Sequence, residues 1–230
     1  SMPIATEIGT ESVIFRDADC IAGEYVLTDA FKPHFRRLNT PAGHNTVVVS
    51  PGDHRHHKGL MYGLRCADLN FWEEDPGPEC GVQEILTTEP IPNGIRQKLC
   101  WRAEDGSRET YRERREITLR REAERGAYHW QWNSRREALR DHILIQSQWS
   151  TQLPDGRLIN YHGLGIRLPW IWRFPAPWAG GVNVAGEPTN ASAACGTDGP
   201  EVGFTGVIDG QWNRTYASVS FRQNHGFTWY

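Results

Sequence analysis

Apolar and polar residues alternate with a period of two in many short segments of this chain, and this pattern constrains its fold more than any other feature. Such alternation places the apolar side chains on one face of an extended strand. The 23 glycines and 14 prolines separate the segments, as expected where strands are joined by turns. We therefore predict an all-β fold, an antiparallel β-sandwich of many strands that resembles a supersandwich and has long loops. The predicted strands are residues 12–16, 23–27, 46–50, 83–87, 95–101, 143–149, 166–172 and 218–222.

One segment, residues 109–125, carries conflicting signals. Its many Arg and Glu residues favour a helix with i,i+4 charge pairs. Its apolar positions, however, all have the same parity, which is the pattern of a strand face. These positions are Tyr111, Ile117, Leu119 and Ala123. Gly126 offers a turn and residues 128–132 alternate again, so we predict a long charged hairpin, with a partly helical segment as the alternative.

The domain organisation follows from length and composition. The 230 residues show no composition shift and no internal repeat, which predicts a single β-sandwich domain over residues 1–230. Residues 178–200 are rich in Gly, Ala, Asn and Pro and are expected to form a long loop. The strand-like pattern of residues 217–221 is followed by an aromatic end, so we expect the natural chain to continue past Tyr230.

Charge and hydropathy exclude several classes of partner. The net charge of −3 argues against nucleic acid or anionic membrane as a partner. No apolar stretch approaches the roughly 18 to 20 residues that span a bilayer. The N-terminus has no basic region followed by an apolar core, so a cytoplasmic location is expected. The five cysteines form no CxxC pair, which indicates reduced thiols rather than a zinc ribbon.

Residues 51–60, with the sequence PGDHRHHKGL, hold three of the nine histidines. On an extended backbone, one face would carry His54, His56 and Lys58, and the other would carry Asp53, Arg55 and His57. Two imidazoles at i,i+2 on one face suit metal ligation or proton transfer. The alternative is a polar loop whose histidines hydrogen-bond locally.

Five further residues are candidates for the same site. Lys32 and His34 are predicted to face the histidine cluster, although both residue types are ordinary on a surface. His162 would complete a histidine site. Arg167 lies among apolar residues, so it should face either a ligand or an ion-pair partner. Trp72 is the best candidate for stacking on a sugar ring. The acidic residues at 73–79 are interpreted as solvated surface, with a carboxylate ligand as the alternative.

Several motifs are shared with a known family. They are residues 31–38 (FKPHFRRL), 53–60 (DHRHHKGL), 70–72 (NFW), 161–168 (YHGLGIRL) and 203–219, which contains an Asn213-Arg214 pair. With them the chain resembles, over most of residues 8–225, the soluble bacterial family labelled methane oxygenase PmoA, which has KPYF, DHPHHRGL and FW motifs. Arg55 and Lys58 depart from the family's Pro and Arg. The resemblance implies a β-sandwich and a role in carbohydrate metabolism. A membrane methane monooxygenase is not expected, because the chain has no spanning segment.

We therefore expect an enzyme that uses the histidines for general acid/base chemistry on a sugar or oxidised sugar, as a lyase, epimerase or hydrolase. The predicted catalytic residues are Asp53, His54, His56, His57, Lys58 and His162, and the predicted substrate-binding residues are Lys32, His34, Trp72 and Arg167.

Two alternatives remain at this stage. Ten tryptophans are compatible with a non-catalytic carbohydrate-binding module. A metalloenzyme would bind Zn, Mn or Fe through His54, His56 and His162, although the charge of Lys58 opposes a bare cation. No other cofactor is predicted, because GxGxxG, P-loop, GxSxG and HExxH motifs are absent from the sequence. The expected partner is a small molecule or saccharide, and the sequence does not indicate an oligomeric state.

Overall fold

The computed structural model describes residues 3–66, 68–141, 143, 145–173, 179–208 and 216–223, and its regular structure is almost entirely β. Contacts within the chain divide it into two compact units. The larger unit comprises Ser1–Ser147 and His162–Arg167, and the smaller unit comprises Gln148–Tyr161 and Leu168–Tyr230. The sequence predicted one domain and carries no composition shift that would mark this division.

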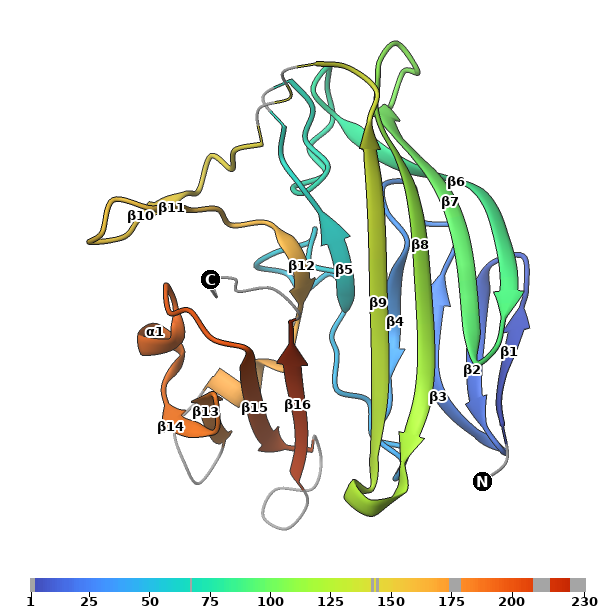
Figure 1. Ribbon diagram of the computed structural model, residues 1–230, viewed down its shortest axis with the longest axis vertical. Coiled ribbons are helices and arrows are strands. Elements are labelled where there is room, and N and C mark those ends of the chain that lie inside the picture. Colours follow the sequence, from blue (N-terminus) through green and yellow to red (C-terminus); the bar gives the residue numbers. More distant parts are fainter. Residues whose placement is uncertain are drawn as a thin grey trace. The chain divides into compact units, whose positions relative to one another are not determined.

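Six antiparallel strands form the first sheet of the larger unit (Figure 1). In spatial order they are β1 (Ile4–Ile8), β2 (Ser12–Asp17), β3 (Cys20–Val26), β4 (His34–Leu38), β5 (Leu60–Gly63) and β12 (Gly163–Ile166). The edge strand β12 comes from a distant part of the sequence and pairs with β5, with Gly163 opposite Gly63 and Ile166 opposite Leu60.

A second sheet of four long strands runs in sequence order. Its strands are β6 (Gly81–Ile91), β7 (Gly94–Ala103), β8 (Glu109–Glu122) and β9 (Ala127–Ala138). The prediction of a charged hairpin is confirmed, because β8 and β9 pair without a register shift from Tyr111 opposite Ala138 to Glu122 opposite Ala127. A single 3₁₀ turn at Ala123–Arg125 and Gly126 with φ 58° reverse the chain between them. Of the four one-parity residues, Tyr111, Ile117 and Leu119 are buried, whereas Ala123 is exposed in the 3₁₀ turn.

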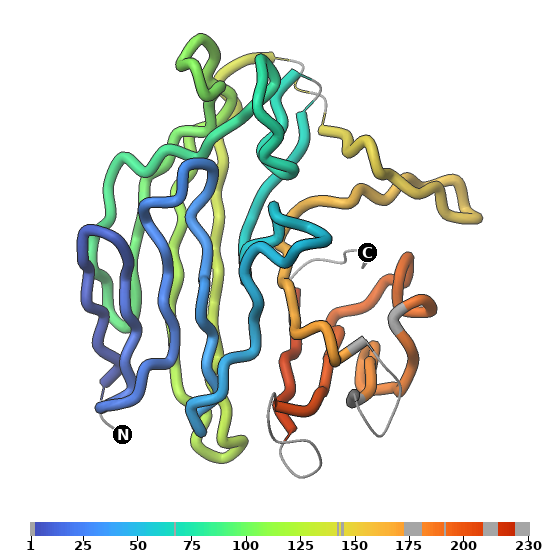
Figure 2. Tube along the Cα trace, turned by 180° about the vertical axis from the view of Figure 1, so that it is seen from behind, coloured from blue at the N-terminus to red at the C-terminus, as the bar shows by residue number. Residues whose placement is uncertain are grey.

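The two sheets of the larger unit pack face to face as a sandwich, and Figure 2 shows the blue strands of the first sheet in front of the green strands of the second. Aromatic residues fill the space between them. The ring of Trp130 in β9 lies 5.0 Å from that of Phe15 and 4.8 Å from that of Phe35. Tyr62 of β5 contacts Trp101 of β7, with centroids 5.6 Å apart. The prediction of an all-β antiparallel sandwich is therefore confirmed.

The smaller unit has a four-stranded antiparallel sheet of its own. The strands, in spatial order, are β14 (Glu187–Thr189), β13 (Ala179–Val184), β15 (Glu201–Val207) and β16 (Tyr216–Arg222). A two-stranded hairpin of β10 (Thr151–Gln152) and β11 (Leu158–Ile159), a 3₁₀ turn at Trp170–Arg173 and the short helix α1 (Ala191–Ala194) complete it. None of the helices in the described residues has the length and apolar character needed to cross a bilayer.

Four predicted segments differ from the structure. Residues 46–50 make only an isolated bridge between Val49 and Lys58, and residues 143–149 only one between Ile145 and Cys66. The strand predicted at 166–172 ends at Ile166, before Pro169, which lacks a backbone N–H for sheet pairing. The described part of the predicted long loop at 178–200 instead contains β13, β14 and α1.

Candidate functional site

The three clustered histidines lie on a tight loop between β4 and β5, not on an extended strand. The Ser50 N–H donates to the His57 carbonyl at 2.7 Å, and the His57 N–H donates to the His54 carbonyl at 3.0 Å. These turns bring all three rings together. The His54 and His57 rings stack 4.7 Å apart at 17°, and the His56 ring lies 4.5 Å from that of His57. The prediction that His57 would face away from His54 and His56 is therefore wrong, because strand alternation does not apply to a turn.

Gly59 fixes the end of this loop against the first sheet. Its φ is +59°, and a Cβ atom built on it would lie 1.8 Å from the carbonyl oxygen of Phe35 in β4. Only glycine tolerates both the left-handed conformation and this close approach. The Gly59 N–H donates to Val48 and the Arg167 N–H donates to Gly59, so the loop is anchored between neighbouring segments.

Asp53 is bound on two sides by charged or polar side chains. Arg167 Nη2, directly after β12, donates to Asp53 Oδ1 at 3.0 Å and to Oδ2 at 2.8 Å. The Nδ1 atom of His54 lies 3.1 Å from Asp53 Oδ2. These bonds, with that from Arg167 the larger, lower the pKa of Asp53 to about 2, so the carboxylate is ionised. Of the two predictions for Arg167, the structure therefore shows an ion pair.

His56 and His57 are held neutral by their surroundings. Burial, reinforced by nearby positive charge, lowers the pKa of His56 to about 4 and that of His57 to about 3. Arg167 Nη1 lies 3.3 Å from His57 Nδ1, and because a guanidinium can only donate, Nδ1 is the acceptor. The Nε2 atom of His56 is buried and has no hydrogen-bond partner among the described residues.

The indole of Trp72 packs against the rings of His56 and His57 and is not exposed for stacking on a sugar. Its residue exposure is only 3%, and its indole lies 6.0 Å from the His56 ring and 5.9 Å from the His57 ring. Gly63 and Gly165 leave room for it, since a Cβ atom on Gly165 would lie 2.8 Å from the indole. The prediction that Trp72 forms a stacking platform is therefore wrong, because the ring is covered.

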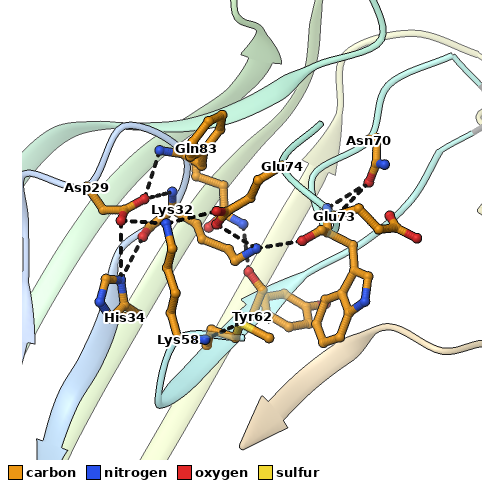
Figure 3. A network of polar contacts seen from close by, with 12 residues as sticks. Asp29, Lys32, His34, Lys58, Tyr62, Asn70, Glu73, Glu74 and Gln83 are labelled. Carbon is orange, nitrogen blue, oxygen red and sulfur yellow. Dashed lines mark hydrogen bonds and ion pairs between the residues drawn. The ribbon is translucent and has the colours of Figure 1, made fainter. Parts of the chain in front are cut away.

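A buried ion network anchors the loop to the sheet (Figure 3). Lys58 Nζ lies 2.6 Å from Asp29 Oδ2 and 2.9 Å from Glu74 Oε2. Lys32 Nζ lies 3.0 Å from Glu74 Oε1 and donates to the Trp72 carbonyl at 2.7 Å. Lys32 has no exposed surface, and burial lowers its pKa. These charges therefore position Trp72 and the loop.

Three predicted site residues consequently take structural roles. The ammonium groups of Lys32 and Lys58 form ion pairs within the network. His34 is 4% exposed, and its Nδ1 atom lies 3.1 Å from the Lys32 carbonyl. Burial lowers the pKa of His34, so its Nδ1–H donates as a neutral imidazole. None of the three has the exposed polar surface that the predicted substrate-binding or catalytic role requires.

Two members of the network were missed in the sequence. Glu74 was interpreted as part of a solvated acidic loop, whereas its side chain is only 9% exposed and pairs with two lysines. Asp29 accepts hydrogen bonds from the backbone N–H groups of Phe31 and Lys32. This Asx turn ahead of a lysine is the one local signal that could have identified Asp29.

His162 lies at the opposite end of β12 from Arg167, and the structure does not bring it to the histidine loop. Its Nδ1 atom accepts the backbone N–H of Arg65 at 3.0 Å. Burial, and then the charge of Arg136, lower the pKa of His162 to about 4. The described residues contain no group of three His, Cys, Asp or Glu side chains placed to hold a metal ion. The predicted metal site of His54, His56 and His162 is therefore not assembled.

A family model described as a family of unknown function (DUF6807) matches residues 19–230, so the chain belongs to this family. No curated protein and no solved structure shows significant similarity to it. The resemblance to the methane oxygenase PmoA family stays a prediction. The Asn213-Arg214 pair of that resemblance lies outside the described residues.

Proposed function

We propose that this member of the family is an enzyme that acts on a sugar or an oxidised sugar, with His54 as its general base. The observation that carries the proposal is the pairing of Asp53 with both His54 and Arg167. Arg167 holds the carboxylate in place, and the carboxylate in turn holds one nitrogen of His54. The His54 side chain keeps 42% of its surface exposed, so its other nitrogen is accessible to a substrate.

The carboxylate decides which nitrogen of His54 carries the proton. Nδ1–H donates to Asp53, which leaves the lone pair on Nε2. Nε2 then accepts a proton from a substrate carbon next to a carbonyl, or from a hydroxyl group or water. The positive charge that develops on the imidazole is stabilised by the Asp53 carboxylate. This step is shared by lyases, epimerases and hydrolases, and the reaction type is left open among them.

The neighbouring histidines favour this role for His54. His57 stacks on His54, and because His56 and His57 are neutral, they add no positive charge next to the base. A cationic neighbour would oppose protonation of His54 during the reaction. The carbohydrate class of the substrate is supported by the tryptophan content and by the resemblance described above.

A panel of unmodified and oxidised glycosides, assayed at enzyme concentrations sufficient for single turnovers, tests the proposal. We expect His54→Gln and Asp53→Asn to lower the rate on the active substrate by about 10²-fold or more. His129→Gln is the matched control, because His129 also has its Nδ1 beside a carboxylate, Glu122, at 3.3 Å on the same unit. If no glycoside reacts, or if His54→Gln reacts as fast as the control, the proposal is wrong.

A second candidate is a non-catalytic carbohydrate-binding module. Trp149 and Trp170 of the smaller unit expose 61% and 50% of their surface, as a sugar-binding indole requires. In this case oligosaccharide binding would be lost in Trp149→Ala and Trp170→Ala and retained in His54→Gln, with no turnover by any variant.

A further inference from the structure

The larger unit contains a second polar cluster, centred on Arg136 of β9. The Arg136 guanidinium carbon lies 5.0 Å from the ring centroid of Tyr62, 5.3 Å from that of Tyr111 and 5.7 Å from that of Trp101. Three aromatic rings therefore hold the cation by cation–π contacts. Such contacts fix the plane of the guanidinium but satisfy none of its N–H donors.

Arg136 differs from the other arginines of the chain. Every other described arginine side chain that is buried or half-buried forms an ion pair with a carboxylate. Arg136 has neither an ion pair nor a hydrogen bond within the described chain, and its Nη1 atom is buried without a partner. A buried charged donor without an acceptor is costly unless a ligand supplies one.

The nearest buried carboxylate cannot supply that acceptor. Glu113 already receives bonds from Trp101 Nε1 at 2.7 Å, from Arg115 Nε and Nη2 at 2.8 Å each and from Ser134 Oγ at 2.7 Å. Four donors occupy its two oxygens, so it is saturated.

Two further donors accompany the guanidinium. The Nδ1 atom of His162 accepts from the Arg65 N–H, and the ring is neutral beside Arg136, so its proton resides on Nε2. The ring of Tyr62, which already contacts the guanidinium, carries a phenolic O–H. A guanidinium, an imidazole N–H and a phenol O–H are all groups that donate to a carboxylate, and the aromatic rings around the guanidinium suit the body of an organic molecule.

We propose that Arg136, His162 and Tyr62 bind the carboxylate of a small organic acid. This site is separate from the histidine loop, since His162 and Arg167 lie at opposite ends of β12. It assigns to His162 a binding role in place of the catalytic or metal role predicted from the sequence. The proposal does not depend on the function proposed for His54.

Isothermal titration of the whole chain at pH 7 and constant ionic strength, with sodium D-gluconate and sodium benzoate as probes and sodium chloride as the blank, tests the proposal. We expect at least one carboxylate to bind with one-to-one stoichiometry and a Kd below 1 mM, on the order of the weakest specific ligands. Arg136→Gln should weaken this binding by about 100-fold, and Arg135→Gln, the exposed neighbour on the same strand, should leave it unchanged.

Tyr62→Phe keeps the ring that supports Arg136 and removes only the hydroxyl group, so it remains informative if Arg136→Gln fails to fold. We expect it to weaken binding about ten-fold, the effect of one hydrogen bond to a charged group. Failure of both probes to bind with a Kd below about 1 mM, or equal binding by Tyr62→Phe and wild type, would overturn the proposal. A wild-type dimer that dissociates in Arg136→Gln would also overturn it, because an acidic side chain of a second copy would then be the partner of Arg136.

Discussion

Arg115 shows how a single charged residue is accommodated in the middle of the sandwich. The side chain has no exposed surface and lies with Glu113 on the same face of β8, at 2.8 Å. Its Nη1 donates to the hydroxyl of Tyr25 at 2.8 Å, and its guanidinium carbon lies 4.7 Å from the ring centroid of Trp132. The Glu113 carboxylate is therefore the charge that makes burial of Arg115 tolerable.

Replacing Glu113 by Gln should destabilise the fold strongly, because it leaves the Arg115 charge buried without a counterion. We expect the free energy of unfolding to fall by about 3 to 5 kcal/mol. The control is Glu109→Gln on the same strand, which removes an exposed ion pair with Arg112 and should cost less than about 1 kcal/mol. Urea denaturation of the two variants checks this, and equal midpoints would contradict it.

The candidate site was only partly predictable at the residue scale. The residue types identified the histidine loop, and Asp53, His54, His56, His57 and Arg167 do come together. The sequence could not predict how deeply each of these side chains is buried. Lys32 and His34 look like surface residues, yet both are buried. The carboxylate that pairs with Lys32 is Glu74, 42 residues further along the chain, and no local pattern encodes that pairing.

At the scale of elements, the geometry of the histidine loop depends on how it closes on the sheet. Gly59→Ala should therefore destabilise the protein, because the new Cβ would collide with the Phe35 carbonyl and φ is positive. We expect a loss of about 3 kcal/mol or more, the sum of the conformational and packing costs. Gly52→Ala in the same loop is the control, since nothing lies within 4 Å of its Cβ position. Thermal unfolding of both variants measures the difference, and similar losses would rule out this role of Gly59.

Most of the strands predicted from alternation are present in the structure. Strands β2, β6, β7, β9 and β16 contain the segments predicted for them, and β8 covers residues 109–122 of the predicted 109–125, because an extended run of one parity has only one way to bury its apolar face. Length does not separate the failures from the successes, since residues 143–149 and 166–172 are as long as the correctly predicted 95–101. Residues 46–50 alternate but end at Ser50 with φ 50°, and their backbone hydrogen bonds go to Leu38, His57, Gly59 and Arg167 instead of to one continuous partner strand.

At the scale of the whole molecule, no shift in composition marks the boundary between the chain's two units, so the sequence does not indicate a division. The larger unit also recruits residues 162–167 from beyond the start of the smaller one, so that β12 can pair with β5. Dividing the sequence at a single position cannot produce these two units, because residues 162–167 belong to the larger unit although residues of the smaller unit precede and follow them. Only the long-range strand pairing reveals this division, and that pairing also brings Arg167 to Asp53.

The stability of the whole molecule should depend on pH through its neutral histidines. The folded-state pKa is about 3 for His57 and about 4 for His56 and His162, all below the usual value of 6.5. Between pH 4 and 6.5 the unfolded chain therefore binds more protons than the folded chain, and the free energy of unfolding must fall as the pH falls. Each such imidazole contributes at most about 1.4 kcal/mol per pH unit, less for the partly exposed His56 and His162.

Urea denaturation at pH 7, 6, 5 and 4.5 measures this dependence. We expect the free energy of unfolding to decline with a slope that steepens below pH 6.5, where the unfolded histidines become protonated. His57→Gln removes the most deeply buried of the three imidazoles, at 7% exposure, and should flatten the slope by about 1 kcal/mol per pH unit, whatever its effect at pH 7. An unfolding free energy that stays constant from pH 7 to 4.5, or an unchanged slope in His57→Gln, would mean that these imidazoles accept protons in the folded protein. His56 and His57 would then carry positive charge beside His54 at every pH below about 6.5, which would oppose its action as a base there.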